Sequence, residues 1–231
     1  MTIPMQHQFE IPLFQFLEEL STNNDRVWFQ QNKSRYERDV LEPSLAFIRA
    51  FAPRLKKISP LFTAEDRRVG GSLMRVYRDT RFSKDKTPYK TNVGIQFRHE
   101  MARDVHAPGF YVHIAPGECF LAVGAWQPDS GSLKSIREAI VEHPDAWRRA
   151  VRGKRFRETF ELAGESLKRP PVDFPADHPL VDDLKRKDFV GIREVTEGEV
   201  LDPGFLDDAA ESFTAAKPLM RFLCEALGVP F

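Results

Sequence analysis

The chain has 231 residues, 42% of them hydrophobic and 29% charged, which is ordinary for a globular protein long enough to bury its own core. Its 34 basic and 34 acidic residues give a formal net charge of zero. A neutral chain argues against a general polyanion-binding protein, whose domain is usually basic. The two cysteines, Cys119 and Cys224, belong to no motif, so we expect neither a disulfide framework nor a thiolate zinc site.

The sequence shows no export or membrane signal. Residues 1–15 lack a basic start followed by an apolar core, and no apolar run approaches the roughly 20 residues of a membrane helix. Two free thiols fit a reducing compartment. We therefore expect a cytoplasmic protein with no membrane partner.

The N-terminal third has the spacing of helices. Apolar residues recur on one helical face over 14–20. Asn24 or Asp25 is expected to cap a short helix that follows. A longer amphipathic helix is predicted over 41–55, where Pro43 marks its start or a kink.

The middle third changes to the period of strands. Apolar and polar residues alternate over 92–98 and again over 110–115, which predicts two half-buried strands. Pro116-Gly117 is a turn signal, so 109–125 is predicted to form a hairpin. A further strand is expected at 73–77.

Helical spacing returns after the hairpin. We predict a helix over 132–143 with Ser132 as its cap, and a second short helix over 143–151. The proline-rich segment 163–180 is expected to be an irregular loop, and 188–195 a short strand.

The last helix is predicted as one continuous element over 203–227. Asp202 would cap it, Pro203 would occupy its first turn, and Gly228 and Pro230 would end it. Taken together, the elements predict an α+β fold. We expect one domain over 1–231, with a largely antiparallel sheet flanked by helical lobes at the N and C termini.

Residues 75–92, RVYRDTRFSKDKTPYKTN, are the least ordinary part of the chain. Basic residues outnumber acidic ones here, although the whole chain is neutral. Arginine binds phosphate or carboxylate through two parallel donors, and lysine supplies a compact charge. We therefore take the basic residues as candidate anion-binding groups: Arg75, Arg78, Arg81, Lys84, Lys86 and Lys90. The alternative is a solvated loop with local salt bridges.

Other side chains are candidates for supporting roles. Tyr77 and Tyr89 offer rings for stacking or hydroxyl groups for donation. Tyr111 and His113 lie on a predicted strand nearby, where a histidine is otherwise an ordinary sheet residue.

If the site is catalytic, we expect Arg78 and Arg81 to clamp the anion and Lys86 to stabilise developing charge. Asp79 and Asp85 would orient those cations, or one of them would act as a base.

The run RDTRFSKDKTPYKTN at 78–92 closely resembles the signature of a family called domain of unknown function 2461. Further pieces that resemble this family lie at 23–37, 109–126, 167–171 and 178–189, so the resemblance covers most of the chain. It implies an α+β intracellular protein and no particular reaction, substrate or cofactor.

One departure from the family pattern is visible after the second hairpin strand. Similar proteins often have a glycine-rich stretch, along the lines of GGGLW, where this chain has AVGAW with Ala122 and Ala125. If the glycines let a backbone approach a ligand, this chain is expected to bind it less closely.

No metal site and no cofactor are predicted. His99, His106 and His113 are spaced by seven residues and form no convergent ligand motif. The sequence also lacks a phosphate-binding loop, a dinucleotide fingerprint and a nucleophile elbow.

The leading hypothesis is a binding site, either catalytic or purely for binding, for a small phosphorylated or carboxylated ligand, built on the basic 75–92 loop. One alternative is a protein-interaction module whose basic face meets an acidic partner. A second is a nucleic-acid-binding protein in which Tyr77, Phe82 and Tyr89 stack on bases, although zero net charge opposes it. A deep cavity would favour a small ligand, a flat basic face a protein, and a long groove a strand.

Overall fold

The computed structural model of the chain describes residues 8–101 and 107–231. Within these residues, antiparallel strands form one sheet in the order β1-β2-β3-β4-β6-β5. The predicted α+β fold and the predicted 109–125 hairpin are confirmed. The strands are β1 (Phe62–Thr63), β2 (Val93–His99), β3 (Gly109–Ala115), β4 (Glu118–Ala125), β5 (Glu161–Ala163) and β6 (Phe189–Val195).

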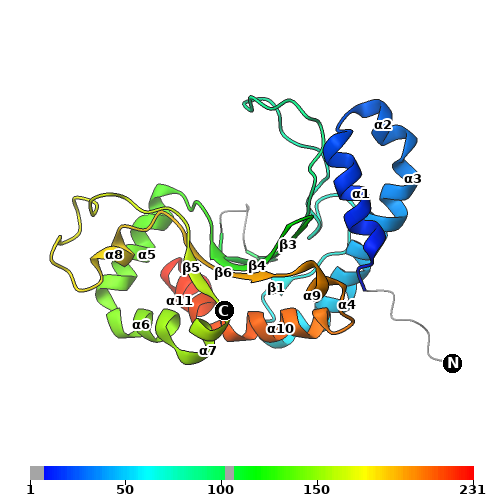
Figure 1. Cartoon of the computed structure of the whole chain (residues 1–231). Coiled ribbons are helices and arrows are strands. Elements are labelled where there is room, and N and C mark those ends of the chain that lie inside the picture. The colour runs from blue at the N-terminus through cyan, green and yellow to red at the C-terminus, as the bar shows by residue number, and fades with distance from the viewer. Residues whose placement is uncertain (1–7, 102–106) are drawn as a thin grey trace.

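One face of the sheet is covered by helices (Figure 1). Phe97 of β2 stacks on Phe51 with 4.8 Å between ring centroids, and Phe110 of β3 packs on Phe213 at 5.0 Å. These rings join a single buried cluster, because large rings remove much apolar area from water. The covering helices are α4 (Glu42–Ile58), α6 (Pro144–Arg152), α7 (Lys154–Thr159), α10 (Phe205–Ala215) and α11 (Lys217–Ala226).

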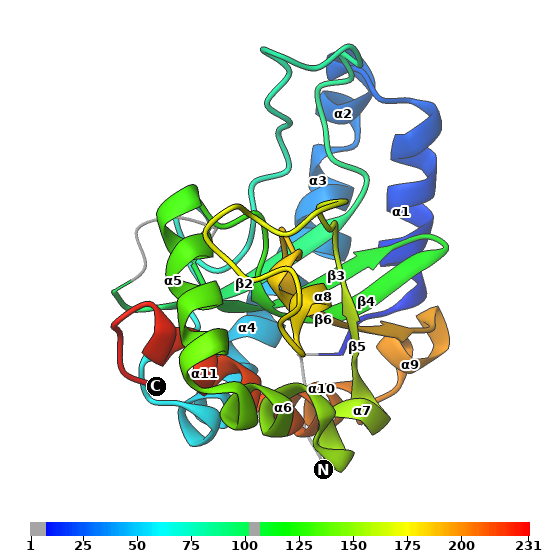
Figure 2. The same ribbon diagram turned by 90° about the vertical axis from the view of Figure 1, so that its left-hand side faces the viewer.

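Among the described elements, no helix lies across the opposite face of β3 and β4 (Figure 1). An N-terminal lobe stands at one side of this open face, and Figure 2 shows the 75–92 segment rising beside it. A second lobe stands at the far end of the sheet. The first lobe contains α1 (Ile11–Thr22), α2 (Arg26–Gln31) and α3 (Lys33–Tyr36); the second contains α5 (Ser130–Glu142) and α8 (Val181–Leu184).

The N-terminal lobe forms much as the sequence predicts. The carboxylate of Asp25 accepts hydrogen bonds from the N–H groups of Val27 and Trp28 at 2.8 and 2.9 Å, so Asp25 caps α2. A π-helical turn at Glu37–Leu41 leads into α4, and Pro43 lies in the first turn of α4, where its missing N–H is not needed.

The prediction of one helix over 203–227 is wrong. The chain forms α10 and then α11, separated at Ala216, and Pro218 stands in the first turn of α11. Proline has no N–H and its ring opposes continuation of the preceding turn, so the axis breaks there. Asp202 does not cap α10; it ends the short helix α9 (Glu197–Leu201), which the sequence analysis missed.

Two smaller predictions are also corrected. Helix α5 begins two residues earlier than predicted, and its cap is Asp129, which accepts from the N–H groups of Gly131 and Ser132. Residues 73–77 form isolated bridges, Leu73 with Ile95 and Tyr77 with Tyr89, and not a strand. In the described part of the chain, no helix is both long and apolar enough to cross a membrane.

Candidate functional site

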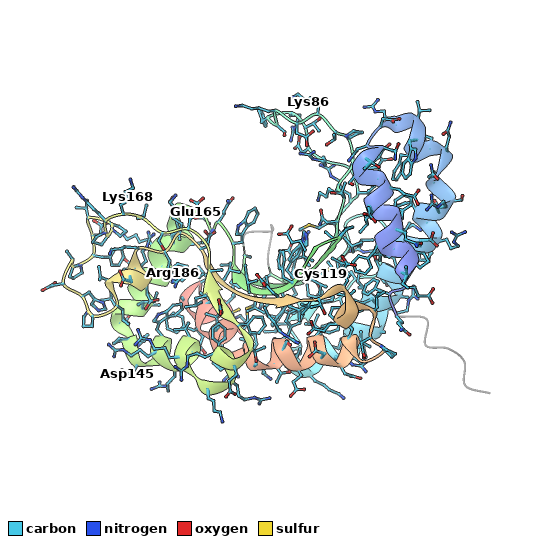
Figure 3. All side chains as sticks on the ribbon, viewed as in Figure 1. Lys86, Cys119, Asp145, Glu165, Lys168 and Arg186 are labelled. Atoms are coloured by element: carbon cyan, nitrogen blue, oxygen red, sulfur yellow. The ribbon has the colours of Figure 1, made fainter. Side chains whose placement is uncertain are left out.

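The segment 74–92, here called the arm, leaves the sheet and returns to it as an irregular ribbon. Backbone hydrogen bonds join its two sides: Lys90 N–H to the Val76 carbonyl at 2.7 Å, and Arg78 N–H to the Pro88 carbonyl at 2.9 Å. Above these bonds the ribbon opens, and Lys86 lies near its free end, away from the sheet (Figure 3). Because Pro88 cannot donate a hydrogen bond, the ladder does not continue as a regular hairpin.

Tyr89 ties the arm to the N-terminal lobe. The amide of Asn24 donates to the Tyr89 carbonyl and accepts from the Tyr89 N–H, both at 3.0 Å. The ring of Phe29 stacks on the Tyr89 ring with 4.0 Å between centroids, and Tyr89 is only 2% exposed. Tyr89 therefore anchors the arm, whereas Tyr77 is half exposed, and its ring is tilted against the Tyr89 ring with 5.4 Å between centroids.

Two of the candidate arginines form local ion pairs. The guanidinium of Arg78 donates to Asp85 and to the Thr87 hydroxyl, and the guanidinium of Arg81 donates to Asp79 at 2.6 Å. Asp79 and Asp85 thus each contact one of these two cations in the structure. The charged side chains of Asp79, Arg81 and Asp85 are exposed and that of Arg78 is partly buried, so the pairs contribute little to stability.

The remaining basic side chains of the arm have fewer hydrogen-bond and ion-pair partners among the described residues. Lys86 donates to the Thr80 carbonyl at 2.8 Å. For Arg75 and Lys84, both exposed, no ion-pair partner lies within the described residues. Phe82 at the free end is 95% exposed.

The ion pairs predict an unusual acid titration of the arm. The hydrogen bond from Arg81 lowers the pKa of Asp79 to about 2, and the hydrogen bond from Arg78 does the same for Asp85. Because both values lie below the ordinary 3.8, the stability from these pairs is complete above about pH 4 and is lost as the pH falls through 2. Carboxyl NMR titration should give both midpoints near pH 2. In an Arg81→Gln variant, only the Asp79 midpoint should return toward 3.8; an unmoved midpoint would contradict the pairing.

A cavity of about 600 Å³ lies on the open face of the sheet. Strand register explains its floor, because Gln96, Tyr111, Ala122 and Ile192 stand side by side on four neighbouring strands. Their sequence neighbours point to the helices on the other face. The open face thus carries the alternate residues of these strands, among them Gln96, Tyr111, Ala122 and Ile192.

Tyr111, His113 and Phe120 form a packed group in this cavity. The His113 ring stacks on Phe120 with 4.5 Å between centroids, and the Tyr111 hydroxyl lies 3.2 Å from His113 Nδ1. Burial raises the pKa of Tyr111 to about 12 and lowers the pKa of His113, so at neutral pH both are uncharged. Gly94 makes room for the group, since a Cβ there would lie 2.6 Å from the Tyr111 hydroxyl.

The side of the cavity next to the arm is cationic. Lys90 and Arg78 line it together with Asp79. Lys90 is half-buried, and its Nζ lies 3.9 Å from the thioether sulfur of Met74, which is a weak acceptor. Burial, and then the charge of Arg75, lower the pKa of Lys90.

The opposite side of the cavity is apolar. Val190 and Ile192 of β6 and the ring of Trp126, which is 55% exposed, line it. Gly124 has a φ of +118°, and a Cβ there would clash with the Phe189 carbonyl oxygen, so this position needs glycine. Of the two alanines that depart from the family pattern, only Ala122 lines the cavity.

A second cavity, of about 810 Å³, lies between the arm and α2. Its lining includes Asn24, Arg26, Tyr77 and Lys86. Arg78 lines both cavities, and so stands between them.

The structure therefore divides the twelve candidate residues that the sequence suggested. Arg78, Lys90, Asp79, Tyr111 and His113 line the sheet-face cavity. Arg78, Lys86, Tyr77 and Tyr89 line the arm–α2 cavity. Four line neither of these cavities: Arg75, Arg81, Lys84 and Asp85.

Several lining residues were missed. Gln96 follows from the alternation over 92–98, which places it on the face opposite Ile95. No such signal places Val190 and Ile192 in the cavity, because the pairing of β4 with β6 joins segments far apart in the chain, and Trp126 lies directly after the end of β4.

The histidines do not converge. His99 is buried on the helix-covered face, where Nε2 lies 2.8 Å from the Pro230 carbonyl oxygen and Nδ1 accepts from the Met101 N–H. His113 lies on the open face, and His106 lies outside the described residues. No group of three or more potential metal ligands occurs in residues 8–101 and 107–231.

Fold and site define an α+β protein whose antiparallel sheet has one helix-covered face and one open face, with a basic arm at its side. The chain matches the model of the family described as conserved hypothetical protein (DUF2461) over residues 12–222, and it belongs to this family. No curated protein and no solved structure matches the chain.

Proposed function

We propose that the sheet-face cavity binds a small ligand with a carboxylate or phosphate head and an apolar ring. The observation that carries this proposal is the half-buried ammonium of Lys90, which has a thioether and no carboxylate within 4.0 Å among the described residues. A charge that has lost part of its water without gaining a partner is costly, and an anionic ligand would offset that cost.

The rest of the cavity suits the ligand's apolar part. Its volume of about 600 Å³ lies in the range of small-molecule sites, which are mostly apolar with a few placed polar groups. Phe120, Trp126 and Ile192 offer surfaces for a ring, while Lys90 and Arg78 stand on the other side. The orientation that follows places the anionic head toward the arm and the ring toward β6.

If the ligand reacts in this cavity, His113 is the group suited to accept a proton. Its lowered pKa keeps the imidazole neutral at pH 7, and in the tautomer whose Nδ1–H donates to the Tyr111 hydroxyl oxygen at 3.2 Å, Nε2 is free to accept a proton. Asp79, with a pKa of about 2, is a poor base. Of the two roles that the sequence suggests for the aspartates, orientation of the cations is therefore favoured over proton transfer.

The test is a titration with phenyl phosphate, followed by NMR of the Tyr111, Lys90 and Gly94 resonances and by Trp126 fluorescence. We expect tighter binding of phenyl phosphate than of phenol or inorganic phosphate, because each of those lacks one half of the ligand. Binding should weaken with salt, since charge attraction is screened within about 8–10 Å near physiological ionic strength. Equal affinity for phenyl phosphate and phenol would refute the cationic role of Lys90.

A second candidate function is contact with an acidic protein through the free end of the arm. The observation that favours it is the exposed Phe82 ring, with the Arg81 guanidinium 5.8 Å from its centroid. A Phe82→Ser variant separates the two functions, because it leaves the sheet-face cavity intact and should bind phenyl phosphate as the natural protein does.

A further inference from the structure

A third cavity, of about 430 Å³, lies in the lobe at the far end of the sheet, where Figure 3 labels Glu165 and Arg186. It lies between α5 and the segments around Glu165 and Lys187, and none of its lining residues lines the sheet-face cavity. Arg137 of α5 reaches this cavity from the same helix face as Leu133, one turn earlier.

Arg137 is a buried cation without a counter-ion. Its side chain is 7% exposed, and its Nη2 donates to the Arg186 carbonyl at 2.7 Å. Its Nε has no partner, and no carboxylate lies within 4.0 Å of the guanidinium among the described residues. Burial lowers the pKa of Arg137, but an arginine remains charged. A charge held this way is costly unless something pairs with it.

The carboxylates of the same cavity are already engaged. Asp188 is 3% exposed and accepts from the N–H groups of Gln127 and Glu165, both at 2.8 Å. The carboxylate of Glu165 pairs with Lys187 Nζ at 2.8 Å. Neither pairs with Arg137, so its charge is left for a group from outside the described chain.

We propose that this cavity binds a small aliphatic carboxylate, with its two oxygens on the Arg137 guanidinium. The planar guanidinium matches a carboxylate through two parallel hydrogen bonds. Asp188 and Glu165 in the lining repel a doubly charged phosphate more than a singly charged carboxylate. Leu133, Leu167 and Pro128 give the cavity an apolar side that suits a short chain. This site is independent of the proposed function of the sheet-face cavity.

The experiment is an NMR titration of the full chain with propionate, following the side-chain Nε–H signal of Arg137. We expect a saturable shift with propionate and at least tenfold weaker binding of inorganic phosphate. An Arg137→Lys variant, which keeps the charge and loses the planar donors, should bind propionate at least tenfold more weakly. The matched control is Arg152→Lys on the exposed side of the neighbouring helix, which should bind as the natural protein does.

Three results of these titrations would each contradict the proposed carboxylate site. No saturable shift of the Arg137 signal, phosphate binding as tight as propionate binding, or equal propionate affinity in both variants overturns the proposal. If Arg137→Lys fails to fold by circular dichroism, the titration of the natural protein still decides. A pentapeptide with a free C-terminal carboxylate, compared with its amide, tests the source of the carboxylate. Binding of the free-acid peptide but not propionate would retain carboxylate recognition but overturn the small-molecule assignment.

Discussion

Replacing Lys90 with methionine is expected to weaken phenyl phosphate binding about 10- to 150-fold, because a hydrogen bond to a charged group contributes about 1.5–3 kcal/mol. Methionine has a similar length and keeps the packing against Met74, so the cavity retains its shape. The melting temperature should stay the same or rise slightly, since the variant removes a half-buried charge that has no carboxylate partner in the described chain. Isothermal titration calorimetry and thermal unfolding measure the two effects.

The matched control is Lys84→Met, which removes the same charge from an exposed position on the arm that lines neither cavity. It should change phenyl phosphate affinity less than threefold, and that change should vanish at high salt. Equal losses in both variants would mean that the arm attracts anions only by its total charge. The cavity would then have no special role for Lys90.

For the charge-rich arm, the sequence alone does not decide which basic residues form a binding site. The sequence left two interpretations open, an anion-binding site and a solvated loop with local salt bridges. Arg81 with Asp79 and Arg78 with Asp85 have the geometry of the second interpretation. Lys90 forms no such ion pair within the described residues and is half-buried where the chain returns to β2, and no local pattern encodes that burial.

Strands β2, β3, β4 and β6 were predictable, whereas the last helix was not. Alternation over 92–98 and 110–115 reports burial on one face, and a strand has a period that few other structures share. In the C-terminal segment, α10 and α11 both bury one face against the same core, so a helical stripe runs through the break. Pro218 is the residue in the sequence that indicates the break, and its effect on the backbone outweighs the continuous apolar stripe.

The cavity on the open sheet face can be described only with both the sequence pattern and the three-dimensional structure. Alternation predicts that Tyr111 and His113 point away from Val112, but it does not show that their face lacks a covering helix. The register of β4 with β6 supplies the apolar side of the cavity, and that pairing joins segments separated by four helices and the short strand β5. The arm supplies the cationic side, and its position depends on contacts with the N-terminal lobe.

Replacing Asn24 with alanine should therefore impair both stability and binding. The variant loses both hydrogen bonds to Tyr89 and leaves that N–H and carbonyl without these partners next to a buried ring. We expect a loss of about 1–3 kcal/mol in the free energy of unfolding, the cost of polar groups left unsatisfied. Phenyl phosphate affinity should also fall under native conditions, because Lys90 follows Tyr89 directly and the arm loses its attachment. Urea denaturation and calorimetry give the two values.

Two further variants show whether the attachment itself is responsible. Asn23→Ala is the matched control, because among the described residues the Asn23 amide donates to its own exposed helix end, to the Glu19 carbonyl and the Thr22 hydroxyl. It should cost less than about 1 kcal/mol and leave ligand affinity unchanged. Asn24→Asp can still accept from the Tyr89 N–H but cannot donate to the Tyr89 carbonyl, so it should fall between the natural protein and Asn24→Ala. If Asn24→Ala behaves like Asn23→Ala, the stack of Phe29 on Tyr89 holds the arm without help from Asn24.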